Sequence, residues 1–497
     1  MNCFYDFKLD AWSRIEVVLE GKAGEKIEFA VGECVKDERI NREPGGFRIF
    51  QRNEIVLNGG VEKFSFVPQP GGVQPIALKS PFEFEIIPMR YAEINGDCRV
   101  ISVERTPIYP VEFNDNDAHF ESDDPVLNQI WEMCKYTMKA TAVFGMFIDG
   151  ERERLPYEGD TYINQLGWFC CCVDSQIPRR TIEHLFEYHT WPFEWFLLMP
   201  QIVKDYMLYS GDIDFFKQWE KSLEDCLLSD FLDSDGLLAE HENTKRIRTI
   251  VDWPVGERDN YELGDLNLVS NCYYYNALNV MAELSGESEY LERAIAVKTA
   301  IRRKFMKDGV FVDSFGSSHT ALHSSLFALH FGLGELSECP YIEEKGMACS
   351  VYAAQFLLDC CFSHCMEQHA KNLLVSKDLR SWHNMISKGA TISMEAWDDC
   401  FKPNQDWNHA WGAAPANIIP RCIAGIRPIE YGFKKFIFDP HPADLKHFYL
   451  KHPTCNGMIE VVYDNGIFEL AIPNGTEALF NGSILKPGTH QLEIIKK

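Results

Sequence analysis

A densely charged segment, residues 147–160, holds the side chains best suited to acid–base chemistry. It contains five carboxylates and two arginines in fourteen residues, and it follows directly on the apolar run 142–148. Charge runs usually face water, but Pro156 and Tyr157 interrupt this one, and the apolar approach predicts a rigid loop that leaves a core. Crowded carboxylates raise one another's pKa, as a general acid requires, while arginines keep others ionised. The segment is therefore a candidate wall of a catalytic site.

A second candidate carboxylate, Glu395, stands among small and apolar residues, with Trp397 two positions further on. A glutamate near a tryptophan is most often an ordinary surface residue. A glycosidase, however, needs two carboxyl groups on opposite sides of the scissile bond, and aromatic faces on which the sugar can stack. The long separation in sequence between the 147–160 segment and Glu395 is compatible with both lying at one mouth of a helical barrel.

Two further segments carry aromatic residues of the kind that line sugar sites. His409 lies between Trp407 and Trp411. A lone histidine more often makes a structural hydrogen bond, but the two flanking tryptophans favour a sugar subsite. Trp253 follows an aspartate and precedes a proline, and it fits a core position as well as it fits a site. The residues alone leave both interpretations of Trp253 open.

Other chemistries lack their motifs. The sequence has no phosphate-binding P-loop, no dinucleotide-binding glycine pattern, no H-E-x-x-H and no G-x-S-x-G. Seventeen cysteines and fifteen histidines are present, but no C-x-x-C pair or other spacing proposes a metal site. We therefore expect neither a cofactor nor a metal.

Composition limits the partners and the compartment. The formal net charge of −26 disfavours a nucleic acid or an anionic membrane surface and fits a neutral or cationic substrate. An odd and large number of cysteines favours a reducing compartment, and neither a signal peptide nor a membrane-spanning stretch is evident. These features predict a cytoplasmic protein with a small-molecule partner and leave a homo-oligomer open.

The periodicity of apolar residues divides the chain into three parts. Residues 1 to about 105 alternate in the manner of strands, as in Ile15, Val17 and Leu19 and again in 82–86, and favour an antiparallel sandwich. Helical spacing then runs to about residue 425, beginning at Asp124 as N-cap and Pro125; it fits a closed double ring of helices or an irregular bundle. Strands return afterwards, with a hairpin turn at Asn465-Gly466. The predicted boundaries are 1–110, 111–428 and 429–497.

The candidate segments resemble bacterial α-L-rhamnosidases of glycoside hydrolase family 78. Residues 149–160 resemble a family signature that begins with Asp, continues through an Arg-Glu-rich stretch and ends in Gly-Trp-x-Gly-Asp. Residues 389–397 look like a later Ala-Thr…Trp-Glu-x-Trp motif, and His409 falls in an Asn-His pair. Tyr157 and Met394 stand where the family has Trp, and the stretch before Glu153 is about two residues shorter than its pattern. The resemblance runs from about residue 20 to the end.

This resemblance implies a multi-domain α+β protein with a central (α/α)6 barrel flanked by N-terminal and C-terminal antiparallel β-sandwich domains. It also implies hydrolysis with inversion, with Glu153 as general acid and Glu395 as general base, their carboxyl groups roughly 6.5–9.5 Å apart. The implied substrate is a terminal α-L-rhamnoside or a similar deoxysugar. The predicted substrate-binding residues are Asp149, Arg152, Tyr157, Asp160, Trp195, Trp253, Trp397 and His409.

Two alternatives stay open. One is another inverting helical-barrel hydrolase, for example for an unsaturated uronide or a different hexoside. The other is a sugar-binding protein without catalysis, against which the presence of both Glu153 and Glu395 argues, because a binding module needs no isolated base. In each case the expected partner is a carbohydrate.

Overall fold

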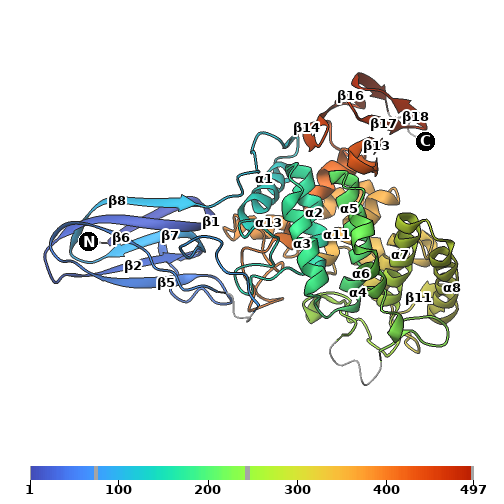
Figure 1. Cartoon of the computed structure of the whole chain (residues 1–497), viewed down its shortest axis with the longest axis horizontal. Coiled ribbons are helices and arrows are strands. Elements are labelled where there is room, and N and C mark those ends of the chain that lie inside the picture. The colour runs from blue at the N-terminus through green and yellow to red at the C-terminus, as the bar shows by residue number, and fades with distance from the viewer. Residues whose placement is uncertain (1, 72–75, 241–246, 494–497) are drawn as a thin grey trace.

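The computed structural model describes residues 2–71, 76–240 and 247–493. It has an N-terminal β part (2–107), a helical part (125–423) and a C-terminal β part (426–493). In Figure 1 the N-terminal β part projects to one side of the helices, and the C-terminal β part packs on the helices at a separate place. The predicted mixture of a large helical part and flanking strands is confirmed.

The N-terminal β part is a six-stranded antiparallel sheet in the order β5-β2-β7-β1-β6, in which β8 also pairs with β1. The long strand β1 pairs with β7 along its first portion and with β6 and β8 along its second. Ile15, Val17 and Leu19 of β1 pack in one apolar cluster together with residues of the strands that pair with β1, as their alternation predicts. The strands are β1 (Asn2–Gly21), β2 (Lys26–Gly32), β3 (Val35–Lys36), β4 (Arg39–Ile40), β5 (Phe50–Val56), β6 (Gly60–Ser65), β7 (Ile87–Asn95) and β8 (Cys98–Pro107).

The helical part begins as the sequence predicts. Asp124 caps α1, since its carboxylate accepts hydrogen bonds from the backbone N–H of Val126 (3.0 Å) and Leu127 (3.2 Å), with Pro125 in the first turn. The helices are α1 (Pro125–Thr141), α2 (Glu158–Cys171), α3 (Gln176–Glu187), α4 (Phe193–Phe196), α5 (Met199–Ser210), α6 (Phe215–Asp225), α7 (Leu268–Ser285), α8 (Ser288–Phe305), α9 (Leu322–His330), α10 (Tyr341–Lys345), α11 (Val351–Ser363), α12 (Glu367–Leu374), α13 (Trp382–Ser387) and α14 (Pro415–Ile418).

The C-terminal β part contains two sheets. One has the order β19-β16-β15-β14-β9 and takes β9 (His119–Ser122) from the segment before α1; the other has the order β12-β13-β17-β18. The predicted Asn465-Gly466 turn is confirmed, because it joins the antiparallel strands β15 and β16. The strands are β12 (Ile426–Glu430), β13 (Lys435–Phe438), β14 (His447–Thr454), β15 (Gly457–Asp464), β16 (Ile467–Ile472), β17 (Glu477–Phe480), β18 (Ser483–Leu485) and β19 (Gly488–Glu493).

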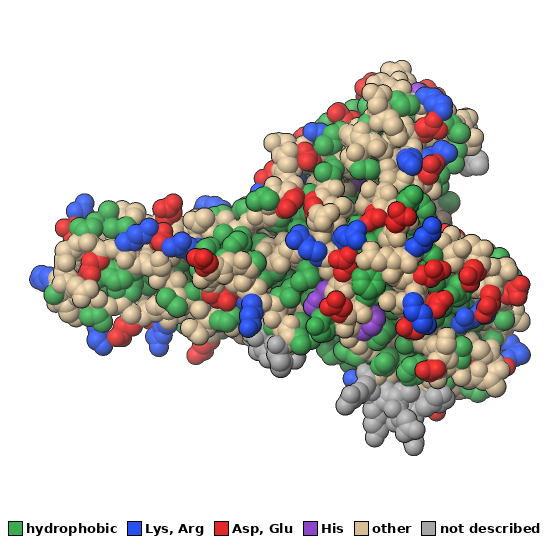
Figure 2. Space-filling view, viewed as in Figure 1, with side chains coloured by type: hydrophobic (Ala, Val, Ile, Leu, Met, Phe, Trp, Pro, Cys, Tyr) green, Lys and Arg blue, Asp and Glu red, His purple; other side chains and the backbone are tan. Residues whose placement is uncertain are grey.

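The surface carries both signs of charge. Figure 2 shows acidic and basic side chains interspersed over the face in view, without a large basic area there. Among the described residues, no helix is both long enough and apolar enough to cross a membrane.

The N-terminal β part holds two loops of the helical part through buried polar contacts. The Asp10 backbone N–H donates to Thr391 Oγ1 (2.8 Å), and Glu33 Oε1 accepts from the Asn408 side-chain amide (2.9 Å). Asn408 Oδ1 in turn accepts from the Glu151 backbone N–H (2.8 Å). The charged segment 147–160 and the segment around His409 are therefore linked both to each other and to the N-terminal β part.

Asp10 and Glu33 form a buried carboxyl pair at this junction, each 5% exposed. Burial is the main cause that raises the pKa of Asp10 to about 6, and burial together with the charge of Asp10 raises the pKa of Glu33 well above its usual value. The folded protein therefore holds a proton here that the unfolded chain releases near pH 4. Its stabilising contribution is present below pH 4 and is lost as the pH rises to about 6.

We expect Asp10→Asn to make the free energy of unfolding less dependent on pH in this range, because an amide can donate a hydrogen bond to Glu33 at every pH. Thermal unfolding of wild type and variant between pH 4 and pH 8 measures it. As the pH rises, the free energy of unfolding of the variant should increase relative to that of wild type, by on the order of 2 kcal/mol. Parallel curves would show that the pair does not share a proton.

Candidate active site

A pocket opens on the helical part, and every residue predicted for the site except Trp397 lines it. The pocket also has walls that the sequence prediction did not include, Trp191, Ile250 and Trp411. The lining residues are Asp149, Arg152, Glu153, Tyr157, Asp160, Trp191, Trp195, Ile250, Trp253, Glu395, His409 and Trp411.

The segment before α2 folds back on itself and so presents its apex to the pocket. The backbone N–H of Asp149 donates to the carbonyl of Leu155 (2.9 Å), and that of Arg154 to the carbonyl of Gly150 (2.9 Å). The apex carries Arg152 and Glu153. Helix α2 starts a few residues later and brings Asp160 from its first turn to the same pocket.

Two other carboxylates of the 147–160 segment, Glu151 and Glu158, make buried structural contacts outside the pocket. Glu151 is 1% exposed and pairs with Arg154 (2.6 Å), and it also accepts from the Trp12 indole N–H (2.7 Å) of the N-terminal β part. Glu158 is buried and accepts from the backbone N–H of Thr190 (3.0 Å). Neither glutamate lines the pocket, so the predicted cluster of carboxylates divides into a structural set and a site set.

Glu153 and Glu395 differ in accessibility. The Glu153 side chain is 22% exposed, and one of its oxygens accepts a hydrogen bond from the Tyr157 hydroxyl. Glu395 is 1% exposed, and it lies between its Lys402 partner (3.4 Å) and the bidentate guanidinium of Arg152 (2.6 and 2.8 Å). Arg152 Nε also lies 3.3 Å from Glu153 Oε1. One arginine thus connects the two glutamates.

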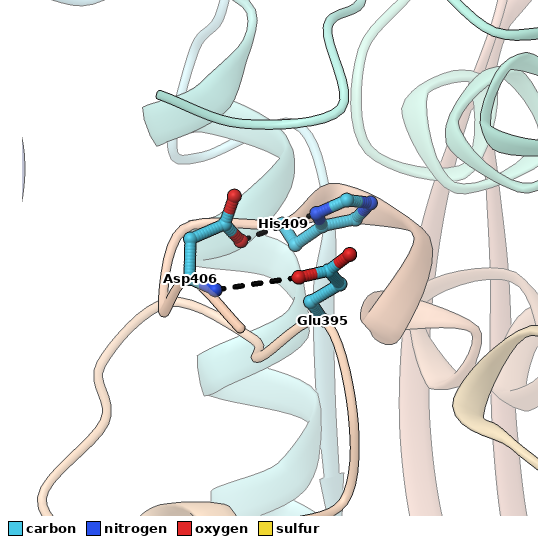
Figure 3. Close-up of side chains that lie close together, drawn as sticks. All are labelled: Glu395, Asp406 and His409. Carbon is cyan, nitrogen blue, oxygen red and sulfur yellow. Dashed lines mark hydrogen bonds and ion pairs between the residues drawn. The ribbon is translucent and has the colours of Figure 1, made fainter. Parts of the chain in front are cut away.

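His409 forms the centre of a buried ion cluster, part of which Figure 3 shows. Its Nε2 lies 2.9 Å from Asp160 Oδ1 and its Nδ1 3.2 Å from Asp406 Oδ1. Burial by itself lowers the pKa of His409, but Asp406 and Asp160 outweigh burial and raise that pKa well above its usual value. The ring is therefore an imidazolium that donates to both aspartates. The Asp406 backbone N–H points at Glu395 Oε2 (3.4 Å).

Asp149 is a buried carboxyl with one free oxygen. Its Oδ1 accepts from the Leu155 backbone N–H (3.0 Å), whereas its Oδ2 has no hydrogen-bond partner among the described residues. Burial raises the pKa of Asp149 well above its usual value; the charge of His409 opposes this increase, and Glu153, Asp406 and Asp160 add to it. A neutral carboxyl of this kind can donate a hydrogen bond to a substrate oxygen.

Aromatic side chains form the apolar wall. Tyr157 and Trp195 meet edge to face, with ring centroids 5.7 Å apart, and a Cβ at Gly159 would lie 2.6 Å from the Trp195 ring. Glycine at 159 therefore lets this indole approach α2. The Trp411 indole N–H donates to the Glu395 carbonyl (2.9 Å), which fixes the backbone of that glutamate.

Trp397 corrects the sequence prediction. It is fully buried, its indole N–H donates to the Cys349 carbonyl (2.8 Å), and its ring packs edge to face on Trp382 with centroids 4.9 Å apart. Trp397 supports the Glu395 segment from the core and does not face the pocket. The residue that sequence reasoning should have included is Asp406, which stands three positions before His409 and contacts its ring.

The acidic cluster does not fit a metal ion. Ligand atoms of Glu395, Asp406 and His409 lie within 4.8 Å of one another, which is a spacing that can hold a cation. However, Arg152 and Lys402 already balance the charge of Glu395, and a protonated His409 has no lone pair to offer.

The chain matches two family models. Residues 115–423 match the bacterial alpha-L-rhamnosidase 6 hairpin glycosidase domain. Residues 425–480 match the bacterial alpha-L-rhamnosidase C-terminal domain. None of the curated proteins compared with the chain matches it in sequence.

Several solved structures share the fold. The alpha-L-rhamnosidase of Aspergillus terreus has a TM-score of 0.80 at 16% identity, covering 99% of this chain and 62% of its own. The GH78 family rhamnosidase of Bacillus sp. GL1 has a TM-score of 0.75 at 15% identity, and the match covers 95% of this chain and 51% of that protein. The Streptomyces avermitilis alpha-L-rhamnosidase complexed with L-rhamnose has a TM-score of 0.73 at 15% identity, and the match covers 96% of this chain and 48% of that protein. This chain therefore spans about half to three-fifths of the length of these relatives.

Proposed function

The chain belongs to the bacterial alpha-L-rhamnosidase six-hairpin glycosidase family of glycoside hydrolases, and we propose that it removes a terminal α-L-rhamnose or similar deoxysugar with inversion. One observation carries this proposal: Glu153 and Glu395, far apart in sequence, line one pocket with unequal exposure. We further infer that the helices of the helical part form an (α/α)6 barrel with the pocket at one mouth.

In the proposed reaction Glu153 is the general acid. Its side chain is the more accessible of the two, and the Tyr157 hydroxyl and Arg152 Nε (3.3 Å) contact one oxygen each, which positions the carboxyl to protonate the glycosidic oxygen. Glu395 is the general base that takes a proton from water attacking the opposite face of the sugar ring. Because Arg152 engages both oxygens of Glu395, one of these hydrogen bonds must open for the water to reach it.

The remaining walls favour a deoxysugar over a uronide. Arg152 and His409 are both already paired with carboxylates, so neither is a free cation for a substrate carboxylate. Trp195 and Ile250 instead offer apolar contact of the kind a sugar methyl group requires. A neutral Asp149, whose Oδ2 has no hydrogen-bond partner among the described residues, is suited to bind a ring hydroxyl.

We expect 4-nitrophenyl α-L-rhamnoside to be hydrolysed and unsaturated uronides to be resistant. The matched comparison is 4-nitrophenyl α-L-mannoside, which differs from the rhamnoside by a hydroxyl at C6. Its kcat/KM should be lower by about tenfold or more, because that hydroxyl would be buried against apolar walls. Measured kcat/KM values across this panel check the assignment; preference for the uronide would contradict it.

A further inference from the structure

A short segment of the N-terminal β part, residues 45–48, is fixed on the loop beside Glu395. The Phe47 backbone N–H donates to the Gln405 carbonyl (3.1 Å), and a Cβ at Gly46 would lie only 2.5 Å from that same oxygen. Gly46 also has a φ of +58°, which favours glycine. The Arg48 guanidinium binds Asp399 through two hydrogen bonds of 2.7 and 2.8 Å. These contacts fix the backbone that carries Phe47.

The Phe47 ring lies beside the arginine that connects the two glutamates. The guanidinium carbon of Arg152 is 5.5 Å from the ring centroid. Phe47 is 39% exposed, whereas the Arg152 side chain is only 10% exposed. Phe47 does not line the pocket itself. An accessible aromatic ring thus stands just outside the pocket, next to the residue in contact with both Glu153 and Glu395.

The unequal exposure of the two glutamates indicates on which side the leaving group lies. The general acid must reach the glycosidic oxygen, so the leaving group extends from the sugar past Glu153. Glu153 is 22% exposed and Glu395 is 1% exposed, so this direction leads toward solvent. Because Arg152 Nε lies 3.3 Å from Glu153 Oε1, a ring beside the Arg152 guanidinium is adjacent to that path.

We propose that Phe47 forms a subsite for the leaving group of the substrate and binds the flat face of an aryl or sugar ring. This inference rests on the proposed function. Aromatic and sugar faces stack on exposed phenylalanine rings because both surfaces lose contact with water. The N-terminal β part then contributes directly to substrate choice, through a residue far in sequence from the two glutamates.

The test compares two leaving groups on one sugar, 4-nitrophenyl α-L-rhamnoside and α-L-rhamnosyl fluoride, in which the fluoride has no ring to stack. Phe47→Ala should lower kcat/KM for the aryl substrate by about tenfold more than for the fluoride, mainly through KM. Phe47→Tyr should restore most of the difference. Phe4→Ala is the matched control, because Phe4 is also 39% exposed and lies in the first strand of the same β part.

An equal loss on both substrates would overturn the inference, because it would mean that Phe47 only shields the Arg152 ion pairs. Unchanged kinetics on both would overturn it as well. Failure of the proposed function has a different signature: the wild-type protein would then hydrolyse neither rhamnoside, whatever residue stands at 47.

Discussion

Glu395→Gln is expected to reduce kcat for an α-L-rhamnoside by roughly 10⁴-fold, which is the upper range for loss of a general base. Glutamine keeps the volume of the side chain, and its single carbonyl oxygen can still accept from Arg152 and Lys402 in the place of Oε1, so the fold should survive. It cannot accept a proton from water. Steady-state kinetics on 4-nitrophenyl α-L-rhamnoside measure the effect, and KM should change far less than kcat.

Two measurements make this result specific. Asp398→Asn is the control, since Asp398 lies in the same segment but pairs with Lys388 (2.5 Å) outside the pocket. It should retain kcat within a few-fold of wild type. Added azide should restore turnover in Glu395→Gly, because a small anion can replace the activated water, and the product should be a β-azide. Wild-type kcat in a folded Glu395→Gln protein would remove Glu395 from the mechanism.

Glu153→Gln is expected to lower kcat/KM by about 10²–10⁴-fold, with the size of the loss set by the leaving group. A leaving group of high pKa needs the proton that Glu153 supplies, and one of low pKa departs as an anion. The loss should therefore be largest for an alkyl or disaccharide rhamnoside and smallest for a 2,4-dinitrophenyl rhamnoside. The slope of log kcat/KM against leaving-group pKa, compared between variant and wild type, measures this dependence on the leaving group.

Glu85→Gln is a suitable control for this variant. The Glu85 side chain is 25% exposed, close to the value for Glu153, and it pairs with the neighbouring Arg154 (2.9 Å) away from the pocket. It should leave the leaving-group slope as it is in wild type. The same slope in Glu153→Gln and wild type would mean that another group protonates the glycosidic oxygen.

Local signals in the sequence were sufficient for much of the fold. The cap at Asp124 and the turn at Asn465-Gly466 depend on neighbouring backbone groups, so the sequence pattern determines them directly. The strand pattern at 82–86 was misleading. Phe82 and Phe84 are 39% and 37% exposed and stack on each other outside the strands of the described chain.

The site was predictable as a set of segments and less so as individual side chains. Residue types and order placed Glu153, Glu395 and His409 in one predicted site, and all three line the same pocket. The direction in which a side chain points from an irregular loop depends on tertiary contacts, so Glu151 and Trp397 were found to face the core. Nothing in the local sequence of Phe47 connects it to the pocket, because that connection arises from the packing of the N-terminal β part on the helical part.

The most direct test of the central claim is the configuration of the sugar at the moment of release. The wild-type protein is mixed with an aryl α-L-rhamnoside in deuterated buffer, and the anomeric proton signals are followed by NMR before mutarotation equilibrates them. A general acid and a general base acting on one water molecule predict that β-L-rhamnose appears first and the α-anomer grows in later. Initial release of α-L-rhamnose would require a covalent intermediate, and it would contradict the roles given to Glu153 and Glu395.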